Sequence, residues 1–275
     1  MKINRIFAII DPTSDNENLI NRLNRIAQRA DSAANVSIHA YCCHYSNAPT
    51  SDPRMFERVA RSRMEMWINS LFSELVAAGM NVTTEVEWDP DWREAVPRAA
   101  ASANCDMIIK NSYSHRSDLR LSKQIDRAIL RKANAPVLLL RSGLQEGNGI
   151  VLGAIKLAEL DDAHERANTK VIDYCRGLEA ISDRFKFHAV SVYSGAENFI
   201  YPEDLAKKVG IDRTRAHSID GSPASGIEMV AKKLDAEVVF LGCVKKGGVK
   251  GRLLGTTGEQ LLDTLPADLA LFIQD

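Results

Sequence analysis

The chain has 275 residues, of which 45% are hydrophobic and 26% are charged, and its 35 basic residues nearly balance its 36 acidic ones. This composition is typical of a soluble globular protein long enough for two domains, and it excludes a disordered or fibrous chain. The net charge of -1 argues against a partner of nucleic acid or anionic lipid. The apolar run at residues 7–10 is too short for a signal peptide, and none reaches the roughly 20 residues of a membrane span.

Runs of apolar residues predict buried strands, and apolar residues at steps of three and four predict helices. In the first half the expected strands lie at residues 5–10, 36–43, 82–86, 106–109 and 137–140. The expected helices lie around Leu19 and Leu23 and at residues 54–78, 92–102 and 122–132. The longest has Pro53 in its first turn and Gly79 after its end, which are residues typical of helix termini.

A glycine-rich linker at residues 142–149 is followed by the same order of elements. The expected strands are residues 151–155, 187–193, 215–219, 238–241 and 269–273, with helices at 164–181, 203–209, 225–234 and 257–265. The motif at residues 106–109 returns at 237–241, and the one at 135–140 returns at 267–272. A shift of nearly half the chain predicts two copies of one domain, at residues 1–142 and 150–275.

Strands that alternate with helices predict α/β domains, each with a five-stranded, mainly parallel, Rossmann-like sheet flanked by helices. Ligands of such sheets bind beyond the carboxyl ends of the strands, where the strand order reverses. In the second copy Gly242 and Lys245 follow the fourth strand, and Gly255, Thr256 and Thr257 open the next helix. A glycine loop before a helix start can bind a phosphate, because backbone N–H groups and the helix dipole face the anion.

This loop resembles that of the universal stress proteins. Family members that bind ATP carry glycine, two residues, glycine, nine residues, then glycine and serine or threonine. Here Gly242, Lys245, Gly255 and Thr256 keep the spacing with one glycine replaced. The duplication is similar to the tandem, double-domain members. The resemblance implies an adenine nucleotide alpha hydrolase-like fold in each half and a role in the stress response.

Departures from the family pattern divide the ATP signature between the halves. ATP-binding members carry an aspartate after the first strand, where the first copy has Asp11 and the second has Lys156. The first copy instead lacks the loop: Asn111 and Ser114 stand for the first two glycines, and Lys123-Gln124 for Gly255-Thr256. The resemblance therefore implies a non-enzymatic regulatory module with a weakened ATP site in its C-terminal half. The alternative is an ATP-binding switch with slow or no hydrolysis.

The candidate cofactor-binding residues also have structural explanations. They are Gly242, Lys245, Gly255, Thr256, Thr257, Lys156 and Asp11. Thr256 and Glu259 have the spacing of a capping box, and Asp11 before Pro12 and Thr13 is typical of a turn. Lys156 can neutralise a neighbouring carboxylate or occupy the space that a nucleotide would fill. A third hypothesis is an apolar cavity for another small ligand, near Asp11 and the long helix.

No catalytic or metal-binding pattern is present in the sequence. The six histidines lack zinc-ligand spacing, and His39 and His188 lie inside expected strands as sheet residues. The odd number of cysteines, five, without a C-x-x-C motif predicts reduced thiols and a cytoplasmic location. The basic residues of the helix at 122–132 predict a solvated face, because no aromatic residue interleaves them to stack on bases.

The first expected contact is between the two halves of the chain. The two halves are predicted to pair through their last strands, residues 137–140 and 269–273, because such apolar edges otherwise invite association. A homodimer and unidentified protein partners stay open, and no nucleic acid or membrane is expected.

Overall fold

The computed structural model describes residues 3–29, 35–47, 51–112, 119–141, 148–158, 160–244 and 256–274. The first half contains β1 (Arg5–Ile9), α1 (Glu17–Arg29), β2 (Ser37–His44), α2 (Pro53–Leu71), α3 (Ser73–Ala77), β3 (Asn81–Trp88), α4 (Trp92–Ser102), β4 (Met107–Ser112), α5 (Leu119–Lys132) and β5 (Val137–Arg141). The second half contains β6 (Ile150–Ala154), α6 (Asp162–Ile181), β7 (Lys186–Tyr193), α7 (Pro202–Val209), β8 (Ala216–Asp220), α8 (Pro223–Leu234), β9 (Val238–Val244), α9 (Thr256–Thr264) and β10 (Asp268–Gln274).

All of these strands join into one ten-stranded sheet with the order β3-β2-β1-β4-β5-β10-β9-β6-β7-β8. Neighbouring strands are parallel within each half, and the second half repeats the order of the first in reverse. The halves meet at β5 and β10, which pair antiparallel with Leu271 opposite Val137 and Leu269 opposite Leu139. These are the strands through which the sequence predicts that the halves pair.

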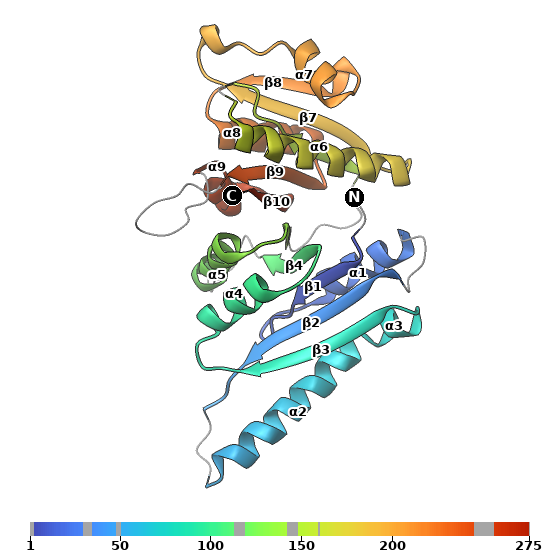
Figure 1. Cartoon of the computed structure of the whole chain (residues 1–275), viewed down its shortest axis with the longest axis vertical. Helices are drawn as coiled ribbons and strands as arrows, with labels where there is room; N and C mark the ends of the chain where they lie inside the picture. The colour runs from blue at the N-terminus through green and yellow to red at the C-terminus, as the bar shows by residue number, and fades with distance from the viewer. Residues whose placement is uncertain are drawn as a thin grey trace.

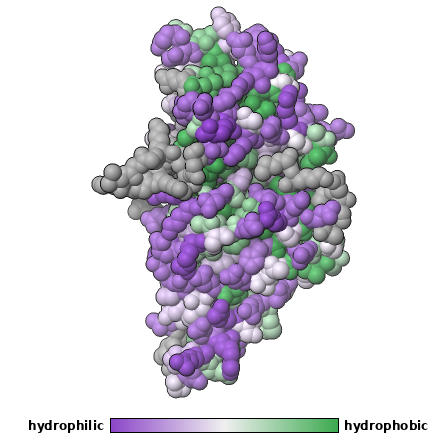
Figure 2. All heavy atoms as spheres, viewed as in Figure 1, coloured by the Kyte–Doolittle hydropathy of each residue, from purple (hydrophilic) through white to green (hydrophobic). Residues whose placement is uncertain are grey.

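Helices cover both faces of the sheet, so that the molecule has three layers (Figure 1). One core cluster contains buried side chains of α1, α2, α3, α6 and α7, and the other contains those of α4, α5, α8 and α9. Each cluster includes strands of both halves, which makes the core continuous across the β5–β10 junction. The outer surface on the side shown in Figure 2 is mostly hydrophilic. Among the described helices, none has the length and apolarity to cross a bilayer.

The predicted long helix at residues 54–78 is wrong in one respect: it is two helices. The helix α2 ends at Leu71, and α3 begins at Ser73 after Phe72, whose backbone (φ -97°, ψ 3°) leaves the helical region. The hydroxyls of Ser70 and Ser73 donate hydrogen bonds to the carbonyls of Trp67 and Ser70, at 2.7 and 2.8 Å. Serine hydroxyls that bond to the preceding turn bend helices. The bend lets Phe72 and Leu75 reach the core.

Candidate functional site

The strand order reverses at two places, between β1 and β4 and between β6 and β9. Ile9 lies opposite Lys110 in the first pair, and Ala154 lies opposite Leu241 in the second. Asp11 and Lys156 each follow two residues after the last paired residue of β1 and β6. The crevice beyond these carboxyl ends is the place where a Rossmann-like sheet binds its ligand.

In the first half Asp11 is held in its own turn. Its carboxylate accepts hydrogen bonds from the backbone N–H and the hydroxyl of Thr13, at 2.9 and 2.6 Å. The side-chain amide of the buried Asn16 donates to the carbonyl oxygen of Asp11 at 2.9 Å. These contacts match the turn role that the sequence favours for Asp11.

A buried polar cluster occupies the end of β4, where the glycine loop would begin. Lys110 Nζ lies 2.9 Å from Asp126 Oδ1, and Ser112 donates to the other oxygen of Asp126 at 2.5 Å. Arg141 Nη1 donates to the Ser112 hydroxyl at 3.2 Å. All four side chains are buried. Burial of two cations and a carboxylate requires mutual pairing, so this cluster is built as a structural unit.

In the second half Lys156 is held by a matching clamp. Its backbone N–H donates to Asn168 Oδ1 at 3.1 Å, and Asn168 Nδ2 donates to its carbonyl at 2.7 Å. Asn16 and Asn168 therefore have the same role in the two halves: each donates a hydrogen bond to the backbone carbonyl of the residue two positions after the first strand. Neither was predicted, because they stand five residues after Asp11 and twelve after Lys156, which hides the correspondence in the sequence.

The N-terminus of α6, next to Lys156, already holds a carboxylate. Asp161 accepts from the backbone N–H of His164 at 2.8 Å, and His164 Nδ1 lies 2.7 Å from the same oxygen. Hydrogen bonds from the His164 backbone and side chain lower the pKa of Asp161, and the charge of Lys156 lowers it further. Lys156 thus interacts with a neighbouring carboxylate, as its structural explanation predicts, and Asp161 occupies the anion position of this helix.

Gly242 has a packing role that the sequence did not reveal. A β-carbon at this position of β9 would lie 2.7 Å from Ala167 Cβ and 3.2 Å from the Ala167 carbonyl carbon. The absence of a side chain therefore allows α6 to approach the sheet. At the end of the same strand, a β-carbon on Gly258 of α9 would lie 3.1 Å from Cys243 Sγ. The first turn of α9, which contains Thr256 and Thr257, thus packs against the end of β9.

Two of the predicted loop residues, Lys245 and Gly255, lie outside the described residues, as does Ser114 of the first half. Thr256 is exposed and Thr257 is half-buried. Glu259, the predicted partner of Thr256 in a capping box, forms an ion pair with Arg131 of α5 at 3.2 Å. The acidic side chain therefore reaches across to the first half of the chain.

The basic residues of α5 face α9, not solvent alone. Lys123 and Arg127 both pair with Asp263, at 3.2 and 2.8 Å, and Arg131 pairs with Glu259. The predicted solvated face is therefore corrected: these cations form partly exposed ion pairs between the halves. The sequence hid them because α5 and α9 are more than 120 residues apart.

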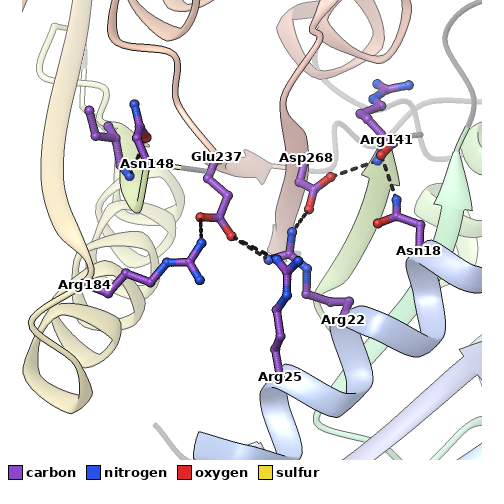
Figure 3. A network of polar contacts seen from close by, with 9 residues as sticks. Asn18, Arg22, Arg25, Arg141, Asn148, Arg184, Glu237 and Asp268 are labelled. Atoms are coloured by element: carbon purple, nitrogen blue, oxygen red, sulfur yellow. Dashed lines mark hydrogen bonds and ion pairs between the residues drawn. The ribbon is translucent and has the colours of Figure 1, made fainter. Parts of the chain in front are cut away.

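A second polar network, fully buried at its centre, joins the halves on the other face of the sheet, where α1 lies (Figure 3). Asp268, at the start of β10, is 1% exposed and accepts from the backbone N–H of Arg141 at 2.8 Å. It also forms an ion pair with Arg22 of α1. Burial raises the pKa of Asp268, against the opposing effects of Arg22 and Arg141.

Glu237 extends this network from the start of β9. Its carboxylate lies 2.9 Å from Arg184, 3.4 Å from Arg22 and 4.0 Å from Arg25. Asn18 of α1 adds a hydrogen bond to the carbonyl of Arg141 at 2.7 Å. Helix α1 of the first half is thereby tied to two strands of the second through two buried carboxylates, Glu237 and Asp268, and water screens these ion pairs less than it screens pairs at the surface.

His39 and His188 are sheet residues with partners, as predicted. His39 Nδ1 lies 2.9 Å from the Thr83 hydroxyl. His188 Nδ1 lies 3.2 Å from His217 Nε2 on the neighbouring strand, and the two rings are stacked. Such a contact needs one ring to donate and the other to accept, so the accepting imidazole is neutral.

Acidification is expected to destabilise the protein through this histidine pair. Burial lowers the pKa of His188 to about 4, with His217 and Arg215 adding to the effect and Glu179 opposing it. The unfolded chain, with a histidine pKa of about 6.5, then binds more protons than the folded chain between pH 6.5 and 4. The free energy of unfolding should fall by about 1–2 kcal/mol over this range, after allowance for solvent screening.

Urea denaturation at several pH values measures this effect. The variant His188→Gln, which cannot titrate, should lose stability less steeply than the unchanged chain between pH 6.5 and 4. Parallel stability curves for the two proteins would contradict the assignment.

Comparisons with known proteins agree with this geometry. Residues 156–272 match the Universal stress protein family. Universal stress protein E of Escherichia coli K12 is 25% identical over 98% of this chain and 94% of its own length. The universal stress protein E homolog of Haemophilus influenzae is 23% identical over 98% and 97%.

Two solved structures have a similar fold over the whole chain. A putative universal stress protein from Pseudomonas aeruginosa UCBPP-PA14 has a TM-score of 0.74 and 23% identity, covering 99% of this chain and 94% of that one. A universal stress protein from Archaeoglobus fulgidus has a TM-score of 0.72 and 15% identity, covering 99% of both.

Proposed function

We propose that this chain is a tandem universal stress protein and that it serves as a non-enzymatic, cytoplasmic regulatory module of the stress response. The match of residues 156–272 to the family and the similarity of nearly the whole chain to universal stress protein E support this proposal. Its nucleotide site is proposed to be weakened in the C-terminal half and lost in the N-terminal half. The protein then acts through what it binds and not through a reaction.

The proposal rests on one observation: side chains of the protein itself already fill the first crevice, beyond the carboxyl ends of β1 and β4. Asp11 is bonded within its own turn, and the end of β4 holds the buried cluster of Lys110, Ser112, Asp126 and Arg141. Lys110 pairs with Asp126, and Arg141 donates to Ser112 and to the carbonyl of Leu262. A phosphate brought there would have to displace these buried contacts. In the second crevice Asp161 holds the N-terminus of α6, which adds a negative charge beside an incoming nucleotide.

The alternative function, an ATP-binding switch, is favoured by one observation. The first turn of α9 packs against the end of β9, which places the N-terminus of α9 beside the strand that carries Gly242. Helix N-termini bind phosphates through their free N–H groups. In this alternative Gly242, Lys245, Gly255 and Thr256 hold the nucleotide, with Thr257 and Lys156 nearby.

Isothermal titration with Mg-ATP separates the two. We expect a dissociation constant of about 0.1 mM or weaker for the unchanged chain, or no measurable heat. The double variant Lys156→Asp/Lys245→Gly restores the family pattern, and its affinity is expected to rise at least tenfold, about 1.4 kcal/mol. Lys186→Asp is the matched control: it lies at the amino-terminal end of β7, away from the carboxyl ends of the strands, and should leave the affinity unchanged.

Sub-micromolar affinity of the unchanged chain would reject the weakened site and support the switch. In that case Gly255→Val is expected to abolish binding while the melting temperature stays the same. An unaltered affinity in the double variant would show that these two replacements are not what weakens the site.

A further inference from the structure

A groove with a volume of about 560 Å³ runs along α2, at the end of the molecule farthest from the second half (Figure 1). Its lining consists mainly of apolar side chains of this helix, together with His44 at the end of β2, Ser46 and Asp52. The apolar lining residues are Met55, Phe56, Val59, Ala60, Met64 and Trp67. Asp11 does not line it, so the groove is separate from the first crevice, and it shares only the long helix with the cavity expected near Asp11.

Most side chains of α2 are exposed or half-buried, which is unusual for a helix that packs on a sheet. Only Ile68 of its 19 residues is buried. Met55, Val59 and Met66 are 45%, 36% and 65% exposed, and the first two lie along the groove. Contiguous exposed apolar side chains that line a groove are typical of binding sites.

The dimensions of the groove fit a helix. Twelve residue steps separate Met55 from Trp67, which is about 18 Å or three helical turns. A helix that enters such a groove places apolar residues at steps of three and four against it. Flexible methionines, here Met55 and Met64, adapt to such anchors. A flat lipid surface, in contrast, would contact the rim and leave the floor of the groove empty.

The charges beside the groove favour an acidic occupant. Helix α2 carries four arginines and two glutamates, and Arg61 is engaged by Glu57 and by the carbonyl of Val86. Within the described parts of the chain, Arg54, Arg58 and Arg63 form no ion pair, and Arg63 lines the groove. Asp52 also lines it, but its carboxylate caps α2 and accepts from the backbone N–H of Met55 at 3.0 Å. Complementary charge favours a negative partner, whereas a second copy of α2 would bring like charges together.

We propose that the α2 groove docks an acidic amphipathic helix of a partner protein. The apolar side of that helix lies on the lining residues, and its carboxylates face Arg63 and the other unpaired arginines. The proposal goes beyond the regulatory function stated above and does not depend on the nucleotide site, because the groove lies in the first half and needs no nucleotide.

A designed peptide tests the groove directly. The probe is a fluorescein-labelled helical peptide of 14 residues with leucines at positions 1, 4, 5, 8, 11 and 12 and glutamates elsewhere. Its companion carries lysines in place of the glutamates. Fluorescence anisotropy without nucleotide is expected to give a dissociation constant of about 10 μM or tighter for the acidic peptide and at least tenfold weaker for the basic one.

Two variants locate the binding. Met55→Glu/Val59→Glu is expected to weaken the acidic peptide at least tenfold, and Arg63→Glu to reverse the preference between the peptides. Both variants change exposed or rim positions, and circular dichroism melting checks that the fold is kept. Met229→Glu, an exposed methionine of α8 far from the groove, is the control and should change nothing.

Equal affinity for the two peptides, or binding that survives Met55→Glu/Val59→Glu, would overturn the proposal. Binding to phosphatidylglycerol vesicles that the same double variant abolishes would assign the groove to a membrane surface. A dimer in light scattering that disappears in that variant would assign it to a second copy of the chain. Either result would also overturn it.

Discussion

Replacing Asp268 by alanine is expected to lower the free energy of unfolding by about 4 kcal/mol. The carboxylate is buried, pairs with Arg22 and accepts from the backbone N–H of Arg141. Its removal leaves the backbone N–H of Arg141 without its acceptor, and it leaves Arg22 with only the longer contact to Glu237, at 3.4 Å. A buried charge stripped of its partner costs several kcal/mol, which is more than the pair itself contributes. Urea denaturation measures the change.

Asp263→Ala is the matched control. Asp263 also pairs across the halves, with Arg127 and Lys123, but its side chain is 43% exposed. Exposed ion pairs contribute about 1 kcal/mol or less, so this variant should lose no more than that. Equal losses in the two variants would show that burial at Asp268 is not what matters.

Replacing Gly242 by valine is expected to lower the free energy of unfolding by about 3 kcal/mol, whether or not the protein binds a nucleotide. The added side chain would overlap Ala167, and part of the contact is with the backbone of α6, which cannot rotate away. Thermal and urea unfolding measure the loss. Nucleotide binding by this variant is therefore uninformative, because any loss would follow from displaced packing.

A double-mutant cycle checks the cause. The double variant Gly242→Ala/Ala167→Gly should lose about 1 kcal/mol less free energy of unfolding than the sum of the two single variants. The reason is that Ala167→Gly removes the carbon nearest to the new β-carbon. Gly177→Ala on the same helix meets no atom within 4 Å and should stabilise the protein by about 0.5–1 kcal/mol. Additive losses at residues 242 and 167 would contradict the close approach.

The sequence predicts the course of the chain well because the relevant signals are local. Helix α4 spans the predicted residues 92–102, and each predicted strand has its counterpart in the sheet. The exception, the break at Phe72, arises from two serine hydroxyls that compete for carbonyls of the preceding turn. The apolar stripe continues through the break and therefore conceals it.

The charged side-chain contacts between the halves could not be predicted from the sequence. Asp268 stands in a run that reads as an apolar strand, and its partner Arg22 is 246 residues away. Their meeting depends on which edges of two sheets join, and on where α1 then lies. For the candidate site, the turn role of Asp11 and the carboxylate beside Lys156 were predictable from residue types. The packing role of Gly242 was not, because it depends on the distance between a strand and a helix.

The joint between the halves is symmetric in its strands but not in its charges. Leu271 opposite Val137 and Leu269 opposite Leu139 are exchanged by the internal repeat. The position that corresponds to Asp268 is Pro136, and the one that corresponds to Arg141 is Ile273. In a dimer of identical chains every substitution appears on both sides of the axis. A covalently joined pair escapes this constraint, so one lobe can specialise in holding the molecule together while the other diverges toward a different task.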